Sequence, residues 1–445
     1  MDATKIAITM SPKLQKVAEL ARRDPHLRLR SLAHLIDEEA LARAFHRLRN
    51  DAACGVDGIT KQVYGQELTT HIRSLHDRMK EGRYRHQSIR RVHIPKAPDK
   101  TRPIGVSCIE DKLVQGALTE LLEAVYEQDF LDCSFGFRPG RSAHDALRAF
   151  NAAAWRGEVE WVLEADIESF FDSIDRKKLK QMLEQRIDDR SLMRLVGKCL
   201  HVGVLDGDQY SEPEQGTAQG SVLSPLLGNV YLHHVLDTWF ERDVRPRLRG
   251  RAIVVRYADD FVIGFERKDD AERVMAVIGA RMQRFGLRLH PDKTRLIPFR
   301  RPSSPAPSGE EPRDAESFDF LGFTLFWRKG RGQSWALGMK TRAARLRRAI
   351  AAVTQWCKQH RHLPIEQQHV ALRRKLDGHM NYFGVNGNWR SLAMLAHVAR
   401  RAWYRWLSRR SQRCTMTWER FGHVLKRFPL PAPSIRVQIW LSTRT

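Results

Sequence analysis

The spacing of apolar residues changes several times along the chain and predicts both helices and strands. Helical spacing occupies residues 1–50 and about 111–126, 176–200 and 269–285. Between residues 89 and 106 two extended runs flank a Pro-Asp-Lys turn, which predicts a hairpin. Most of the chain therefore mixes the two kinds of element.

Further runs of β-branched and aromatic residues have the character of strands. The segment VVRYADDFVIGF (254–265) predicts a second hairpin, residues 159–175 begin as a strand, and 287–299 and 318–327 read as strands. Between the last two, the Pro-, Ser- and Gly-rich residues 301–316 predict a surface loop.

Two loops lead into helices. SFGFRPGRSAHDAL (134–147) enters a helix through Ser142 and Asp145, which have the spacing of a capping box. The segment that begins with GTAQGSVLSPLLGN spans residues 216–240 and predicts a Gly-rich loop that runs into a long apolar helix.

After Met339 the pattern becomes helical throughout. Two apolar stripes consist of Leu346, Ile350, Val353 and Cys357, and of Leu392, Leu395, Ala399, Ala402 and Trp406. Arginines occupy the other faces, and eight of the eleven tryptophans lie beyond Phe320. We expect most of these tryptophans to pack between helices.

The charge of the chain is concentrated in the same region. Of the 445 residues, those from Phe320 onward contain 25 Lys and Arg against three acids, which accounts for +22 of the formal net charge of +24. A nearly neutral body with a strongly basic end indicates an enzyme joined to a nucleic-acid-binding region.

Cysteines and hydropathy restrict where the protein works. The six cysteines are scattered with no C-x-x-C pair, which argues against a zinc ribbon or a disulfide framework. The N-terminus lacks the apolar core of a signal peptide, and no stretch of about 18 apolar residues is present. We expect a soluble, cytoplasmic protein that has no membrane partner.

Acidic residues interrupt two of the predicted strands. Asp259 and Asp260 fall inside the 254–265 hairpin, and Asp166 ends the strand that begins near residue 159. Asp is common in turns and at strand ends, so each site alone is compatible with a structural role. Two neighbouring residues of a strand point to opposite faces, so both aspartates can approach one point only at the tip of the hairpin. Carboxylates from separate strands are what a divalent metal near phosphates requires.

Several motifs together resemble one known family. YADD with the upstream ADIESFFD is similar to the polymerase palm of reverse transcriptases. GTAQGSVLSPLLGN, SFGFRPGRSAHDAL and RPIGVSCIEDKLVQGAL resemble the bacterial group II intron reverse transcriptase/maturase family, in the same order along the chain. The resemblance covers roughly residues 50–410.

The resemblance implies a right-hand polymerase of the α+β class, with an antiparallel sheet in fingers and palm and an all-α thumb/maturase domain. It implies an N-terminal helical extension at 1–50, fingers and palm over 51–330, and a thumb/maturase domain with a basic tail over 331–445. KLDGHMNYFGVNGNWRSL (375–392) resembles the maturase-specific segment.

The resemblance also assigns residues to the site. Asp166, Asp259 and Asp260 are the implied catalytic residues, and with the carbonyl of Ile167 they would bind two Mg²⁺ ions. The implied contacts to the incoming deoxynucleotide are Lys96, Arg102, Phe171, Gln219 and Lys293. Among these, Phe171 corresponds to the steric gate against a ribose 2′-hydroxyl, although an ordinary core aromatic is its alternative.

Three further positions bear on this reading. The family usually has proline where this chain has Ala218, so activity or fidelity could differ. Arg138 and Arg141 are expected to contact the template strand rather than the nucleotide. Many relatives carry a C-terminal HNH nuclease with paired cysteines, but only Cys414 lies past residue 400, so we expect no endonuclease and a primer supplied in another way.

The predicted function is RNA-directed DNA synthesis on the host group II intron RNA, by target-primed reverse transcription, together with assistance to intron splicing. The expected partners are that RNA, an RNA template with a DNA primer, and deoxynucleotides; monomer and dimer both remain open. The alternatives are a splicing-only maturase and a domesticated relative in phage defence or DNA repair.

Overall fold

The computed structural model describes residues 10–97, 100–207, 209–213, 215–217, 220–302, 316–329, 335–410 and 416–440. Within these ranges the side chains of residues 95–97 and 100 are not described. The chain forms two compact units, each assembled from three segments that are distant in the sequence. The first consists of Met1–Arg141, Asp166–Arg247 and Ala276–Pro291, and the second of Ser142–Ala165, Leu248–Met275 and Asp292–Thr445.

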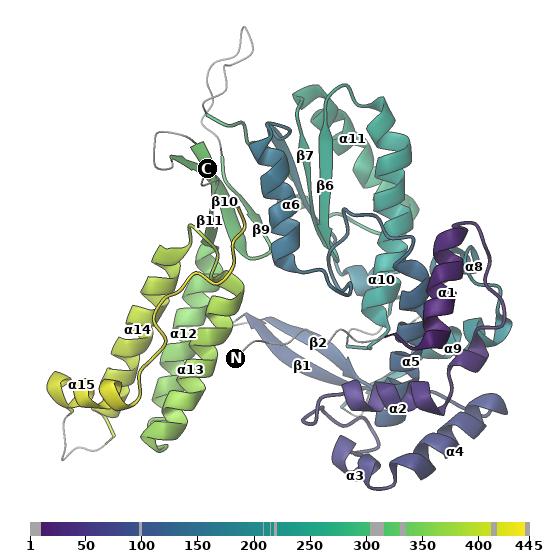
Figure 1. Cartoon of the computed structure of the whole chain (residues 1–445), viewed down its shortest axis with the longest axis horizontal. Coiled ribbons are helices and arrows are strands. Elements are labelled where there is room, and N and C mark those ends of the chain that lie inside the picture. Colours follow the sequence, from purple (N-terminus) through teal and green to yellow (C-terminus); the bar gives the residue numbers. More distant parts are fainter. Residues whose placement is uncertain are drawn as a thin grey trace. The chain divides into compact units, whose positions relative to one another are not determined.

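The first unit is mainly helical (Figure 1). Its α-helices are α1 (Pro12–Arg23), α2 (Glu38–Arg47), α3 (Lys61–Gln66), α4 (Leu68–Lys80), α5 (Ile109–Tyr126), α7 (Phe170–Ser173), α8 (Arg176–Glu184), α9 (Arg190–Leu200) and α10 (Ser224–Leu232). Short 3₁₀ and π-helical pieces are η1 (Ala33–Leu35), η2 (His233–Asp237), η3 (Phe240–Val244) and η4 (Arg245–Arg247). The helix α5 is buried over most of its length, and α1 and α2 pack against it.

A small sheet completes the first unit. Its strands are β1 (Ile89–Ala97), β2 (Lys100–Val106), β4 (Val204–Asp206) and β5 (Gln209–Ser211), in the order β2-β1-β4-β5. The predicted 89–106 hairpin is confirmed: β1 and β2 pair antiparallel, with Ile94 opposite Arg102. The β1–β4 pair is parallel, and β4–β5 is antiparallel.

The second unit contains two antiparallel sheets. The strands β3 (Trp161–Asp166), β6 (Ala252–Tyr257), β7 (Asp260–Phe265) and β8 (Arg295–Pro298) form one sheet in the order β6-β7-β3-β8. The strands β9 (Phe318–Phe320), β10 (Phe323–Lys329) and β11 (Trp335–Thr341) form the other. The helix α6 (Ala143–Trp155) packs against β6 and begins with the predicted capping box of Ser142 and Asp145.

The rest of the second unit is helical. Its helices are α12 (Ala343–Gln359), α13 (Ile365–Phe383), α14 (Trp389–Leu407) and α15 (Trp418–Arg427). The helices α12, α13 and α14 lie side by side in Figure 1 and contact one another. One further helix, α11 (Lys268–Arg284), begins in the second unit and ends in the first. The 3₁₀ turn η5 (Pro291–Lys293) lies between α11 and β8 and spans the boundary between the two units.

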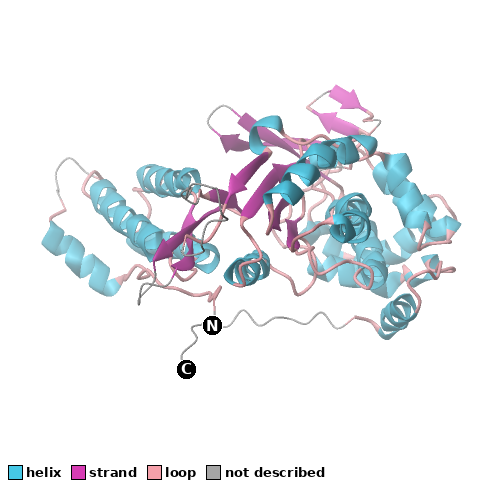
Figure 2. Ribbon diagram, turned by 90° about the horizontal axis from the view of Figure 1, so that it is seen from above, coloured by secondary structure: helices cyan, strands magenta, loops and turns pink. Residues whose placement is uncertain are grey.

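The protein is therefore a mixed α+β chain with largely antiparallel sheets and a helical C-terminal region. Figure 2 distinguishes its helices and strands by colour.

Four predicted elements differ in detail. The 318–327 strand is two antiparallel strands, β9 and β10, joined by a turn. The 176–200 helix is two helices, because Asp189 caps a new start by accepting from the Ser191 and Leu192 amides. The 216–240 helix continues beyond α10 in π-helical form, and the 287–299 strand is reduced to β8. Most of the predicted 301–316 loop lies outside the described residues.

Candidate functional site

The β6–β7 hairpin presents two aspartates at its tip. The predicted hairpin is confirmed, but its turn consists of Ala258 and Asp259, because Tyr257 pairs with Asp260, the first residue of β7. Ala258 has φ of 59°, a left-handed conformation that residues other than glycine rarely adopt. Both aspartates are partly exposed, while the strand behind them, from Phe261 to Phe265, is buried. Strain of this kind persists only where the surrounding structure holds it, and it is concentrated at functional sites.

Arg256 is the buried cation behind this turn. Its side chain is 0 % exposed, and its Nη1 donates a hydrogen bond of 3.1 Å to the Ala258 carbonyl. Because a buried charge is unfavourable unless it is paired, this contact ties the guanidinium to the strained turn. Arg256 is not among the predicted site residues; a lone arginine inside an apolar strand was the signal that could have identified it.

Asp166 is the last residue of β3, the strand next to β7 in the sheet. The Glu160 amide donates to the Phe265 carbonyl at 2.8 Å, so the beginning of β3 lies beside the end of β7. Within the first unit, the backbone after β3 is held by residues 288–290: the His290 amide donates to the Asp166 carbonyl at 2.8 Å, and Ile167 forms a bridge with Leu289.

Tyr382 on α13 belongs to the surroundings of the hairpin in the second unit. Its hydroxyl donates to the Leu321 carbonyl at 2.9 Å, and its ring stacks on Phe323. Burial raises the pKa of Tyr382 to about 12, and the negative charge of Asp260 adds to that rise. The phenol therefore remains protonated at neutral pH next to the acidic turn.

Phe171 lies in a short helix that is joined to the Gly-rich loop in the first unit. The Thr217 amide donates to the Phe171 carbonyl at 2.7 Å, and the Gly216 amide donates to the Ile174 carbonyl at 2.9 Å. Phe170 is buried, whereas Phe171 stays partly exposed. A Cβ at Gly228 of α10 would lie 2.9 Å from the Phe170 ring and 3.2 Å from the Phe171 ring, so glycine makes room for both aromatics.

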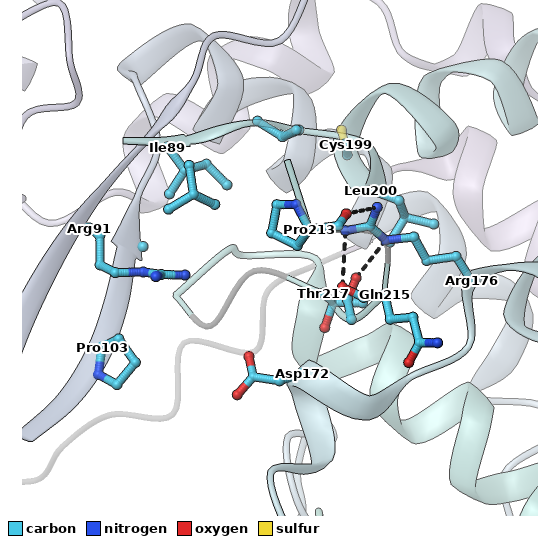
Figure 3. A pocket seen from close by; sticks show the side chains of 14 residues that line it. Ile89, Arg91, Pro103, Asp172, Arg176, Cys199, Leu200, Pro213, Gln215 and Thr217 are labelled. Carbon is cyan, nitrogen blue, oxygen red and sulfur yellow. Dashed lines mark hydrogen bonds between the residues drawn. The ribbon is translucent and has the colours of Figure 1, made fainter. Parts of the chain in front are cut away.

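Arg176 holds the beginning of the same loop, as Figure 3 shows. Its guanidinium donates to the carbonyls of Pro213 at 2.7 Å, Gly216 at 2.8 Å and Gln215 at 3.2 Å. The adjoining pocket has a volume of about 60 Å³, which is far below the ~300 Å³ of a small-molecule site. Arg176 is therefore a loop anchor, and this pocket is not itself a nucleotide site.

The Gly-rich loop also packs on the strand that carries Arg102. Gly220 has φ of 107°, and a Cβ there would collide with the carbonyl oxygen of Gly105 in β2. The glycine is thus required by a close approach of two backbones. The structure therefore brings the end of the loop to β2 at Gly105, three residues from Arg102.

The other predicted nucleotide contacts are less defined. Lys96 lies in β1 at a register shift between Pro95 and Ala97, but its side chain is not described. Gln219 and Ala218 lie outside the described residues. Lys293 ends η5 in the second unit, whereas Arg102 and Phe171 belong to the first.

Arg138 does not have the role expected from the sequence. It is 7 % exposed, and its guanidinium binds the Glu127 carboxylate and the carbonyls of Leu131 and Ser134. These internal contacts make Arg138 a residue that shapes its loop, and the expected template contact is not supported. Arg141 pairs with Asp132 at 2.6 Å.

The C-terminal helices enclose a core of their own. The predicted stripes are largely confirmed, because Val353, Cys357, Leu392 and Leu395 are buried together. The fully buried tryptophan is Trp403, whose indole N–H donates to Gln368 at 3.0 Å.

Trp406 is only partly buried and is surrounded by positive charge. Four exposed cations lie within 6.0 Å of its ring centroid, namely Lys358, Arg361, Arg405 and Arg409. Within the described residues none of the four forms an ion pair with an acid. We call this group the Trp406 cluster; an aromatic ring among unpaired cations suits an RNA strand.

Within the described ranges, no three His, Cys, Asp or Glu side chains are gathered closely enough, as they stand, to form a metal-binding group. No helix in them combines the length and apolar character needed to cross a membrane.

Three features of the protein define its class as a nucleic-acid polymerase. They are a sheet with a strained acidic hairpin, a Gly-rich loop packed on a basic strand, and a basic helical region. Comparison with known proteins makes this specific. The family model described as "Reverse transcriptase (RNA-dependent DNA polymerase)" matches residues 94–325, just over half of the chain. The chain belongs to the reverse transcriptase family.

Relatives include intron-encoded proteins. Protein YkfC of Escherichia coli (strain K12) is 31% identical over 361 residues, which cover 72% of this chain and 90% of that protein. The "Group II intron-encoded protein LtrA" of Lactococcus lactis subsp. cremoris is 35% identical over 212 residues, 46% of this chain and 35% of that protein. "Nuclear intron maturase 2, mitochondrial" of Arabidopsis thaliana is 25% identical over 228 residues, 42% of this chain and 29% of that protein. The matches to these two intron proteins thus span about a third of their length.

Proposed function

We propose that this RNA-directed DNA polymerase copies the group II intron RNA that it binds and also assists splicing of that RNA. The observation that carries the proposal is the β6–β7 hairpin, whose strained turn presents Asp259 and Asp260. Membership of the reverse transcriptase family and the likeness to intron-encoded proteins support the same reading.

Asp166, Asp259 and Asp260 are the proposed catalytic carboxylates. The order of the sheet supports this grouping, because β3 is next to β7 and an antiparallel strand ends where its neighbour begins. Reverse transcriptases as a family use divalent metal ions, and carboxylate and carbonyl oxygens are the ligands that Mg²⁺ prefers. The three carboxylates and the Ile167 carbonyl would hold two Mg²⁺ ions, which supply the charge that activates the primer 3′-hydroxyl and stabilises the pyrophosphate.

The protein's own residues position the reactants. The buried sheet and Arg256 fix the turn, so the carboxylates need little reorganisation when substrate binds. Arg102 and Lys96 on the β1–β2 hairpin, with Lys293, would hold the triphosphate by charge. Phe171 would pack under the sugar, and Gln219 would lie against the nucleotide; the joining of Phe171 to the Gly-rich loop supports this pairing.

The corresponding architecture is that of a right hand. We assign residues 51–330 to fingers and palm, 331–445 to a thumb/maturase domain, and 1–50 to an N-terminal helical extension. The mixed sheets and the separate helical core support the assignment. The Trp406 cluster would then bind intron RNA, with tryptophan stacking on a base and the cations contacting phosphates.

Primer extension on an RNA template, run beside a splicing assay on the intron RNA, tests the proposal. The wild type is expected to extend the primer and to accelerate splicing, while Asp259→Asn loses extension and keeps splicing. The matched control is Asp51→Asn, which changes an exposed acid elsewhere and should leave both activities unchanged.

Two results would contradict the proposal in different ways. Extension by Asp259→Asn at the wild-type rate would remove the hairpin from catalysis. A wild type that accelerates splicing but never extends a primer would leave a splicing-only maturase.

A further inference from the structure

A chain of buried polar side chains in the first unit connects a histidine to the Gly-rich loop. Asp111, Gln115 and Tyr84 are each at most 1 % exposed, and the His86 side chain is 2 % exposed. None of these residues is part of the proposed catalytic or nucleotide-binding set. A buried polar network is costly unless each member is satisfied, so its connections carry information.

The connections run in one line from β1 to the loop. The Val222 amide donates to Gln115 Oε1 at 3.1 Å, and Gln115 Nε2 lies 2.8 Å from His86 Nε2 and 3.3 Å from the Ser107 hydroxyl oxygen. His86 Nδ1 lies 2.7 Å from the Gln87 carbonyl. Val222 comes two residues after Gly220, the glycine that packs on β2.

Two backbone groups at the ends of this line determine where the protons are. The Val222 amide can only donate, so the amide oxygen of Gln115 must face it and the NH₂ group must face His86. The Gln87 carbonyl can only accept, so His86 carries its proton on Nδ1. His86 Nε2 is then the acceptor for Gln115, and the imidazole is neutral in this arrangement.

A second proton on His86 cannot be accommodated without a change in Gln115. An Nε2–H would face the Gln115 NH₂ group, and two donors cannot bond to each other. Rotating the amide by 180° would offer its oxygen to His86, but it would then turn the NH₂ group toward the Val222 amide. Either way one bond in the line is lost, and in the rotated form the lost bond is the one that holds the loop.

The charged neighbours of His86 act in both directions. The residues that face it or line the adjacent pocket are Asp111, Arg176, His201, Tyr210 and Glu212. Asp111 Oδ2 is 3.5 Å from His86 Nδ1 and would attract a cation, but it already accepts from the Gln87 amide while Oδ1 accepts from Tyr84. Arg176, which binds the carbonyls of Pro213, Gln215 and Gly216 in the same loop, would repel a cation.

We propose that the Gly-rich loop is controlled by protonation of His86, transmitted through Gln115, so that nucleotide binding weakens when His86 becomes charged. Gln115 is a positioning residue in this scheme, since it acts through Val222 and the loop. The proposal rests on the proposed function of the loop in holding the incoming nucleotide.

The direction of the pH effect follows from burial. Burial lowers the pKa of His86, with the Gln87 contact opposing, so His86 is neutral at pH 7 and titrates below the ordinary value of about 6.5. Burial raises the pKa of Asp111 to about 7, so Asp111 takes up a proton before His86 as the pH falls. The loss of nucleotide binding is thus expected on the acid side only.

Gln115→Glu is the decisive variant. A carboxylate accepts at both ends, so it can bind the Val222 amide and a protonated His86 at the same time. The test measures KM for deoxynucleotide and kcat separately from pH 8 to pH 5.5, on an RNA template, for the full chain. The wild-type KM should rise about fivefold toward low pH, the effect of losing one ordinary hydrogen bond, whereas in Gln115→Glu it should stay flat. His201→Asn, an exposed histidine nearby, should follow the wild type.

A second measurement follows amide hydrogen exchange in the wild-type peptide that contains Val222 as a function of pH. Because it uses no variant, a folding defect in Gln115→Glu cannot affect it. After correction for the intrinsic pH dependence, protection of this peptide should fall below pH 6.5. An acid rise in KM that is identical in Gln115→Glu, or that disappears only in Asp111→Asn, would overturn the proposal, as would unchanged protection. Absence of DNA synthesis by the wild type at every pH would instead count against the proposed function.

Discussion

The β6–β7 hairpin and the C-terminal helices carry their charges in opposite ways. The hairpin has a few charges in fixed places: two aspartates at a strained turn and one arginine that is fully buried and bonded to that turn. The helices have many charges on exposed, flexible side chains, with four cations around the ring of Trp406.

The difference indicates how each region works. Chemistry at a phosphate requires carboxylates held in one geometry, and a buried sheet provides that rigidity. Binding a long polyanion requires the number of cations more than their exact positions, because each phosphate contact adds a similar increment. Substitutions should therefore act all-or-none in the hairpin and by degrees in the helices.

Removal of divalent metal should produce the largest separation between the two regions. With EDTA, DNA synthesis on an RNA template should fall to background, because the carboxylates alone cannot activate the primer hydroxyl. Binding of a short unstructured RNA, measured by fluorescence anisotropy at constant ionic strength, should remain. Equal loss of both would mean that the helices also depend on the metal.

Arg256→Met should be the most damaging single change to the sheet. It removes a buried cation and leaves the Ala258 carbonyl without its hydrogen bond, which should cost about 1–3 kcal/mol of unfolding free energy. Thermal or urea unfolding measures this effect, and DNA synthesis should fall with it. Arg251→Met, an exposed arginine at the edge of the same hairpin, is the control and should cost under ~0.5 kcal/mol.

Trp406→Leu should weaken RNA binding without stopping catalysis. Loss of one stacked base should cost about 1–3 kcal/mol of binding free energy, and kcat on a short template should stay near the wild-type value. The control is Trp389→Leu, a more exposed tryptophan of α14 that has no described cation over its ring. Similar losses in the two variants would show that the cations around Trp406 are not what binds.

Arg405→Gln and Arg409→Gln should each reduce the salt dependence of RNA binding, which tests whether the cations around Trp406 contact phosphates. Each lost phosphate contact should lower the slope of log K against log salt by about 0.7. A Kd that changes while the slope stays constant would indicate an effect on helix packing instead.

Ala258→Gly should have the smallest effect on stability and the opposite sign. Glycine adopts the left-handed conformation without the penalty of a Cβ, so the unfolding free energy should rise by up to ~1 kcal/mol. The looser turn should at the same time lower kcat several-fold. A lower stability than the wild type would mean that the alanine methyl group contributes packing that outweighs its strain.

The periodicity of the sequence predicts the parts of this picture that depend on local pattern. The hairpin with its aspartates at the tip, the capping box of α6 and the apolar stripes of α12 and α14 all follow from residues close together in the chain.

Hydrogen bonds between a side chain and backbone groups far away in the sequence could not be predicted. Arg176 binds carbonyls about 40 residues away, and Gln115 accepts from an amide 107 residues away. A motif shows that an arginine is present but not which atoms it will meet, which is why Arg138 was assigned to the template although it bonds within its own loop.

The central claim is that catalysis belongs to the acidic hairpin and RNA binding to the basic helices. It is tested most directly by measuring both properties on one preparation of Asp260→Asn. The account predicts that primer extension falls by at least ~10³-fold while the Kd for intron RNA stays within a factor of about two of the wild type. Extension at the wild-type rate, or a Kd that rises in proportion to the lost extension, would contradict it.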